Sequence, residues 1–500
     1  MKKNVILLSI ILSGIVSFTS CNINFSNSFS NAFSFEESEY IDPSLNYTLE
    51  SSKEYYYAVN KNSIYDKHTP LTVGTNKILV IPVVIKGYEK YASDSMKEKI
   101  NKAFFGTTSD TGWQSVKTYY ELSSYNRLKI EGTVTDWYES GLSTSEVYAK
   151  NNPTYNDGGT YAVLDGAINW AKNQGINLDE YDIDDDGYID SVWLIYSCPS
   201  LVKIDGLSNE NNPFWAFTFW DYTKRGKGTK ANPVQNTYAW ASFDFMNSST
   251  VGITIDAHTY IHEHGHVLGL DDYYDTDRGH SPLGGIDMMD LNIGDHCAFS
   301  KFALGWVRPY VVNGECTIEL SQFSLTGRFI LVRSNESPYN DTAFDEYLLI
   351  EYIYPNNLWS QDSFFPYENG PKAYNSPGIR ITHVDARLYS NYSKKFVYSS
   401  SGGGVKVACS NTPSRSYSMG TNELKNDLIC IIPKNKSTSF QESYTAVANN
   451  SSLFVEGDTF DIESYSMFFT DNKFHDGSSF PYTITIENIS YESARISFSL

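Results

Sequence analysis

Apolar residues in the first part of the chain follow two different spacings. Residues 77–85 form a near-continuous run of mostly β-branched residues, which predicts a central strand. Residues 128–134 alternate apolar and polar positions, as a strand does, and residues 191–196 predict a buried strand. Residues 111–120 and 161–173 are typical of helices instead. This mixture continues to about residue 310 and indicates an α/β unit over residues 70–310.

The pattern changes beyond Pro309. Short alternating strands follow one another there, separated by Gly, Asn, Ser and Pro turns, which is typical of β-sandwich modules. The clearest strands are expected at 346–351, 378–385, 482–487 and 494–500. We therefore expect a β-rich domain over residues 311–438 and a C-terminal β module over residues 439–500, the latter either separate or half of one sandwich.

The first residues have a different character again. A basic start and a short apolar stretch predict a secretory signal peptide over residues 1–21, too short for a confident membrane span. Small residues precede Cys21, which resembles the lipidation site of bacterial lipoproteins; ordinary secretion with cleavage elsewhere is the alternative. Residues 22–69 are then a tether or a propeptide-like segment. We expect a secreted protein, anchored to the bacterial cell surface and its membrane by the lipid.

Composition narrows the class of protein. The formal net charge of −21 argues against a nucleic-acid partner. Five cysteines remain after Cys21, an odd and scattered set that predicts no disulfide framework and has no zinc-ligand spacing. A chain of 500 residues can bury its own core, and we expect a monomer.

Residues 262–272 carry the strongest chemical signal. His262 and His266 are one helical turn apart on the same face, a spacing that suits two imidazole ligands of one zinc ion. Glu263 occupies the position of the general base in the H-E-x-x-H pattern. Gly269 allows the chain to turn after the helix, so that Asp272 can return as a third ligand. Three ligands leave a coordination position open for water, which favours a catalytic zinc over a structural one.

Residues 182–190 contain a second candidate metal site. Aspartates alternate along this segment, and Gly187 permits a sharp turn at its sixth position, as calcium loops require. The glutamate that completes an EF-hand is missing, because Trp193 occupies the twelfth position. We expect a shorter, structural Ca²⁺ loop, with an acidic solvated turn as the alternative. Its ligands would be Asp182, Asp184, Asp186, Asp190 and the carbonyl of Tyr188.

These segments together resemble the M6 family of bacterial metallopeptidases, the immune-inhibitor-A-like group of the metzincin clan. The resemblance rests on residues 262–275, with Asp271 in place of the usual proline, on the Met-turn-like segment 284–290, and on residues 298–307. It covers about residues 70–310. It implies a metzincin-like zinc peptidase domain, protein or peptide substrates, and calcium loops ahead of the zinc helix. Either Met288 or Met289 can occupy the Met-turn position, and we assign Met289.

The resemblance leaves the oxyanion stabiliser open. Some metzincins place a tyrosine two residues after the Met-turn methionine, but this chain has Leu291 or Asp290 there. The remaining candidates are Tyr273, Tyr274, His280 and His296. Farther along, His383 and Asp385 suggest a second metal site, although we interpret them as polar residues at a strand end.

The sequence thus predicts a zinc metalloendopeptidase in which Glu263 is the general base for zinc-activated water. One alternative is a cell-surface binding or adhesion protein with a vestigial zinc domain, which the intact Glu263 disfavours. Another is a zinc hydrolase acting on non-peptide substrates.

Overall fold

The computed structural model describes residues 68–500 except 155, 205–211, 222–226, 337–340, 369, 399–404, 417–425 and 444–445. The expected signal peptide, Cys21 and nearly all of the expected tether lie outside these residues. Over the described part of the chain, no helix combines the length and the apolar character needed to cross a membrane.

The N-terminal half is built on one mostly parallel sheet with the order β2-β1-β5-β8-β6, and β3 also pairs with β1. Only β6 runs antiparallel to its neighbour, β8. The strands are β1 (Gly74–Lys86), β2 (Leu128–Val134), β3 (Tyr138–Ser143), β5 (Val192–Tyr196), β6 (Phe217–Trp220) and β8 (Thr237–Ser242). A small separate pair joins β4 (Tyr188–Ile189) to β7 (Val234–Gln235).

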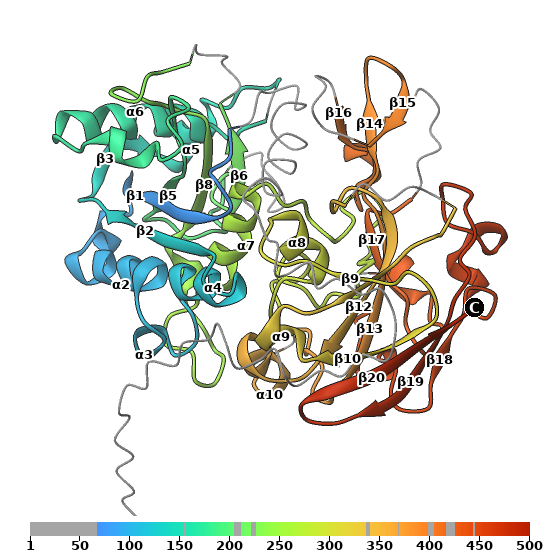
Figure 1. Cartoon of the computed structure of the whole chain (residues 1–500). Helices are drawn as coiled ribbons and strands as arrows, with labels where there is room; N and C mark the ends of the chain where they lie inside the picture. The colour runs from blue at the N-terminus through green and yellow to red at the C-terminus, as the bar shows by residue number, and fades with distance from the viewer. Residues whose placement is uncertain are drawn as a thin grey trace, which may run out of the picture. The chain divides into compact units, whose positions relative to one another are not determined.

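Alternate residues of β1 enter two different cores, which explains its nearly continuous apolar run. Ile78 and Val80 pack in one core, whereas Leu79 and Ile81 pack in the other. Helix α6 contributes to the second core and helices α2, α4 and α7 to the first, so helices cover both faces of the sheet (Figure 1). The helices are α2 (Asp94–Phe105), α3 (Thr108–Thr111), α4 (Val116–Ser123), α5 (Thr144–Tyr148), α6 (Thr160–Asn173), α7 (His258–Val267) and α8 (Ala298–Ala303).

The helix expected over residues 111–120 is divided in the structure. Gly112 adopts a left-handed φ of +86° and ends α3. Helix α4 begins only at Val116, because the Ser115 side chain accepts a hydrogen bond from the backbone N–H of Thr118 and caps it. The other expected helices and strands appear within a few residues of their expected bounds.

Antiparallel sheets follow the α/β region, as expected. One has the order β17-β13-β12-β11-β9, with β11 and β9 parallel; another has the order β10-β20-β19-β18. The two share one apolar core. The strand β10, from the segment before residue 438, pairs with β20 at the C-terminus. Their bounds are β9 (Tyr310–Val311), β10 (Cys316–Ser321), β11 (Ile330–Val332), β12 (Glu346–Ile353), β13 (Gly378–Asp385), β17 (Ile429–Ile431), β18 (Thr459–Phe460), β19 (Thr483–Ile489) and β20 (Ser493–Ser499).

The remaining elements of this region are smaller. A three-stranded sheet has the order β15-β14-β16. Its strands are β14 (Leu388–Ser390), β15 (Lys395–Val397) and β16 (Val405–Val407), and the short helices are α9 (Phe323–Thr326) and α10 (Ser360–Phe364).

A buried ion pair connects the large antiparallel sheet to the α/β region. Arg380 on β13 makes two hydrogen bonds to Glu351 on β12, at 2.8 and 3.0 Å, and both side chains are fully buried. Arg380 also donates to the carbonyl of Ile286, and Glu351 accepts from the N–H of Ala298 at the start of α8. The pair therefore holds the Met-turn-like segment and α8 at fixed positions relative to the sheet.

Removing one partner of this pair leaves a buried charge without compensation. We expect Arg380→Met to lower the free energy of unfolding by about 3–5 kcal/mol, because Glu351 keeps its desolvation cost without its counter-ion. The double variant Arg380→Met, Glu351→Leu should recover most of that loss. Urea titrations of the three proteins, followed by tryptophan fluorescence, measure this; equal losses in the single and double variants would contradict it.

Candidate active site

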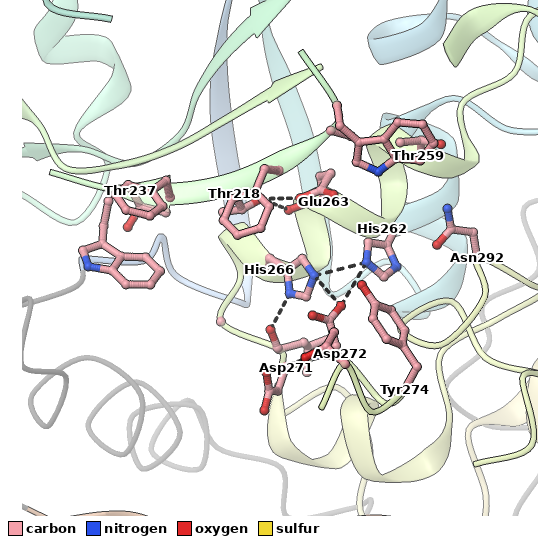
Figure 2. A pocket seen from close by; sticks show the side chains of 18 of the residues that line it. Thr218, Thr237, Thr259, His262, Glu263, His266, Asp271, Asp272, Tyr274 and Asn292 are labelled. Carbon is pink, nitrogen blue, oxygen red and sulfur yellow. Dashed lines mark hydrogen bonds and ion pairs between the residues drawn. The ribbon is translucent and has the colours of Figure 1, made fainter. Parts of the chain in front are cut away.

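Helix α7 and the turn after it bring three metal-binding side chains to one point. The Nε2 atoms of His262 and His266 lie 3.1 Å apart. Asp272 Oδ1 lies 3.3 Å from the first and 3.0 Å from the second. Figure 2 shows the three side chains pointing toward one another. Ligands about 2.0 Å from a tetrahedral zinc lie roughly 3.3 Å from each other, so the spacing fits the ion.

The other nitrogen of each imidazole is hydrogen-bonded to a backbone carbonyl. His262 Nδ1 lies 2.7 Å from the carbonyl oxygen of Met288, and His266 Nδ1 lies 2.8 Å from that of Leu270. A carbonyl oxygen only accepts hydrogen bonds, so each Nδ1 carries the proton. Each Nε2 therefore faces the shared point, where it can offer its lone pair to a metal ion, as zinc-binding histidines do.

The turn that returns Asp272 depends on Gly269. This glycine follows the helix with a φ of +102°, a backbone conformation that side chains disfavour. Asp272 then keeps Oδ1 near the imidazoles while Oδ2 accepts a hydrogen bond from Arg415 at 2.7 Å. Arg415 also contacts Asp271 at 3.2 Å. Sequence reasoning did not indicate Arg415, because it lies 143 residues beyond the aspartate that it contacts.

The electrostatics of these groups favour a cation at their centre. Burial lowers the pKa of His266, but the Asp272 carboxylate outweighs burial and raises it to about 9. Burial likewise raises the pKa of Asp272, yet the two histidines hold it well below its usual range. Positive charge is therefore strongly stabilised where the three side chains meet.

Glu263 lies in the same cleft, with its carboxylate fixed by a neighbouring strand. The hydroxyl of Thr218 on β6 lies 2.9 Å from Glu263 Oε2 and 2.9 Å from the Glu263 carbonyl oxygen, and it donates to them (Figure 2). The side chain of Glu263 is buried, and this desolvation raises its pKa. Thr218 is a second residue that the sequence could not indicate, since nothing in its local context relates β6 to α7.

The Met-turn-like segment lies under the two histidines. The Met288 carbonyl orients His262, whereas the Met289 side chain packs against the helix at Gly265. A methyl group at Gly265 would overlap Met289 Sδ, so the glycine permits this close contact. The two neighbouring methionines therefore have different contacts.

The cleft has a volume of about 540 Å³ and a partly apolar wall. Trp215 and Phe217 line it and remain about half exposed. Of the four candidate oxyanion stabilisers, Tyr274 alone lines the cleft. Its ring lies 6.4 Å from that of His262, and burial keeps its pKa far above neutral pH, so its hydroxyl remains a donor. The Tyr273 hydroxyl is instead hydrogen-bonded to Ser300.

The acidic loop at 182–190 brings together three of its expected ligands. Oxygens of Asp182, Asp184 and Asp190 lie within 4.8 Å of one another. Asp186 is turned away, because one of its oxygens contacts His68 Nδ1 at 2.8 Å and the other accepts the Tyr188 N–H. Burial and neighbouring carboxylates raise the pKa of Asp184 to about 6, and burial raises that of Asp190 to about 8. Gly187 has the expected left-handed φ, +87°.

A buried histidine at the start of α7 was missed by sequence reasoning. His258 Nδ1 lies 2.9 Å from Asp256, and its Nε2 lies 3.6 Å from Asp362. Its ring stacks on Trp113 at 3.9 Å, and the Tyr367 hydroxyl lies 2.6 Å from Nδ1. Burial lowers the pKa of His258, but the two carboxylates outweigh burial and raise it to about 10. This cationic histidine anchors the helix that carries His262 and His266.

Two imidazoles and a carboxylate beside a buried glutamate suggest a zinc peptidase. Residues 84–290 match the family model described as immune inhibitor A peptidase M6, catalytic domain. The chain therefore contains an M6 peptidase catalytic domain, as the sequence resemblance predicted, and such a domain implies a metallopeptidase. The family and the histidine cluster together imply zinc.

Two curated relatives with low sequence identity support the same family. The chain is 27% identical over 212 residues to the pre-pro-metalloprotease PrtV of Vibrio cholerae serotype O1. The aligned region covers 38% of this chain and 22% of PrtV. It is 26% identical over 219 residues to immune inhibitor A of Bacillus thuringiensis subsp. alesti, covering 38% of this chain and 31% of that protein. The chain thus spans less than a third of the length of these relatives.

The charge on His258 makes stability depend on pH in a defined direction. Because its pKa is higher in the folded than in the unfolded chain, its contribution is complete below about pH 6.5 and decreases as pH rises toward 10. Between pH 7 and 9 we expect the stability difference between the parent and His258→Gln to shrink by on the order of 1 kcal/mol per pH unit. Urea titrations at several pH values measure it; a constant difference would contradict the charged state.

Proposed function

We propose that this chain is an exported zinc metalloendopeptidase, in which His262, His266 and Asp272 hold the metal and Glu263 is the general base. The observation that carries the proposal is the convergence of two Nε2 lone pairs and one carboxylate oxygen, with both Nδ1 atoms held by backbone carbonyls. Protein substrates follow from the family, and the activity of the whole chain is our inference.

The chain's own residues account for the proton transfers. When bound, zinc supplies Lewis acidity, which makes water nucleophilic near neutral pH and polarises a carbonyl. The Glu263 carboxylate accepts the proton that water loses as its oxygen attacks the scissile carbon. Glu263 then delivers that proton to the departing amine as the C–N bond breaks. Thr218 keeps the carboxylate in one orientation through both transfers. We assign Tyr274 as a donor to the developing negative charge on the carbonyl oxygen.

The cleft wall supports a peptide as the substrate. Strand β6 is the edge strand of its sheet among the described residues, and it also contributes Thr218 to the site. An extended peptide can add to such an edge through backbone hydrogen bonds. The exposed rings of Trp215 and Phe217 would then contact apolar side chains of the substrate.

The proposed location rests on the sequence, and the proposed oligomeric state rests on the site. The basic and apolar character of residues 1–21 supports export, and Cys21 supports lipid anchoring at the cell surface. We propose a monomer, because the cleft and all the proposed zinc ligands come from one chain.

We also propose that the acidic loop binds Ca²⁺. Asp182, Asp184 and Asp190 supply the hard oxygen ligands that this ion prefers, and their mutual repulsion needs a cation to offset it. The loop directly precedes β5, the central strand of the sheet, so calcium there would be structural.

Glu263→Gln tests the proposed mechanism. The amide keeps the shape of the side chain but cannot accept the proton of water, so casein cleavage by the chain lacking residues 1–21 should fall at least about 100-fold. Zinc content, measured by mass spectrometry of the metal, should stay unchanged. Asp271→Asn removes another carboxylate of the cleft and should retain most of the activity. Equal cleavage by parent and Glu263→Gln would contradict the assigned base.

Absence of cleavage by a zinc-loaded parent would instead favour the binding-protein alternative. In that case, casein and other unfolded substrates would remain intact in the presence of the parent, Glu263→Gln and Asp271→Asn.

Calcium should stabilise the fold through the acidic loop. A concentration about 100 times the dissociation constant should add about 2.7 kcal/mol to the free energy of unfolding. Asp184→Asn with Asp190→Asn should abolish this gain, whereas the exposed Asp185→Asn should keep it. Thermal melts with and without Ca²⁺ measure the effect; an unchanged gain in the double variant would place calcium elsewhere.

A further inference from the structure

A second cluster of metal-binding side chains lies in the β-rich region and shares no residue with the cleft. Glu346 on β12 and His383 on β13 occupy paired strands, with Glu346 opposite Asp385 in register. His475 joins them from the segment between a short 3-10 helix (Thr470–Asn472) and β19. One ligand atom from each of the three side chains lies within 4.8 Å of the others.

The distances within this cluster place three donor atoms around one point. Glu346 Oε1 lies 3.0 Å from His383 Nε2 and 3.7 Å from His475 Nδ1. Asp385 Oδ2 lies 3.1 Å from the same nitrogen of His475 and offers a further oxygen beside it. Two imidazoles with carboxylates are a ligand set that suits zinc and related transition metals.

The glutamate at the centre of the cluster is held in place by backbone groups. Its Oε1 accepts the N–H of His475 at 2.5 Å, and its Oε2 accepts the N–H of Asp476 at 2.9 Å. These hydrogen bonds fix the carboxylate while it faces the imidazoles. His383 and Glu346 are both nearly fully buried, and His475 is partly buried beside them.

The charges nearby are compatible with a divalent cation. Arg387 makes two hydrogen bonds of 2.7 Å to Asp385 and lies 3.5 Å from Glu346 Oε2. Two carboxylates, those of Glu346 and Asp385, thus face one guanidinium group, so a divalent cation beside them would add the missing positive charge.

The cluster repeats the composition of the cleft site. In the cleft, two histidines also meet one carboxylate, that of Asp272. Arg415 donates a hydrogen bond to the other oxygen of that carboxylate. In the β-rich cluster, the backbone N–H groups of residues 475 and 476 bind the two oxygens of Glu346, so this glutamate is not free to act as a base. Its geometry suits a structural ion.

We propose that Glu346, His383 and His475 bind a second divalent transition metal, with Zn²⁺ the best match, which fastens the C-terminal segment to the central antiparallel sheet. The ion would connect His383 to His475, which are 92 positions apart in the chain. Closing so long a loop restricts the unfolded chain and so stabilises the folded one. The proposal does not depend on peptide cleavage.

Counting zinc in the full chain tests this proposal. After equilibration with Zn²⁺ and gel filtration, the parent should retain about two zinc ions per chain, and His262→Gln with His266→Gln should retain about one. His383→Gln with His475→Gln should also retain about one. His280→Gln removes another buried histidine that faces a carboxylate, Asp275, and should keep both ions.

Cobalt provides an independent readout of the same site. In the His262→Gln, His266→Gln variant, Co²⁺ should give visible absorption bands of a protein-bound ion, and these bands should vanish when His475→Gln is added. If the β-cluster variants fold poorly, the His262→Gln, His266→Gln variant still tests the proposal, because it leaves that cluster intact: absence of the bands from it would overturn the proposal. A parent with one zinc, lost entirely in His262→Gln, His266→Gln, would overturn the proposal and leave the cluster as hydrogen bonds and ion pairs.

Discussion

The candidate active site depends on two backbone carbonyl groups. Met288 and Leu270 each accept the Nδ1 proton of one histidine, and these hydrogen bonds orient both Nε2 atoms toward the same point. The Met288 carbonyl is positioned by its own segment, in which Asp287 accepts the N–H groups of Met289 and Cys297 at 2.8 Å. The geometry of the metal ligands is therefore a property of the turn beneath them as much as of the helix that carries them.

The β-rich region is a structural part of this arrangement. Arg380 binds the Ile286 carbonyl from the central antiparallel sheet, and Arg415 holds Asp272. Asn411 donates to the Tyr273 carbonyl, next to that aspartate. Residues more than a hundred positions away thus constrain the third proposed ligand. The β-rich region thus contacts the segment matched by the family model, residues 84–290, at the turn and at the third proposed ligand.

Sequence reasoning succeeded where the information is local. The spacing of residues 262–272 encodes a helix face and its turn, and the alternation at 128–134 and 378–385 encodes strands whose bounds the structure reproduces. It failed where tertiary contacts decide. Thr218 and Arg415 come from distant segments, as do Asp362, Tyr367 and Trp113, which surround His258. His383 was interpreted as a strand-end residue because Glu346 and His475 are adjacent to it only in the fold. Within 111–120 a local signal, Gly112, was overlooked.

The central claim is that the point between His262, His266 and Asp272 holds zinc. Diffraction data collected on either side of the zinc absorption edge, from crystals of the chain lacking residues 1–21, test it most directly. The account predicts an anomalous peak about 2 Å from both Nε2 atoms and from Asp272 Oδ1, present above the edge and absent below it. Zinc-loaded crystals without a peak at that point would contradict it.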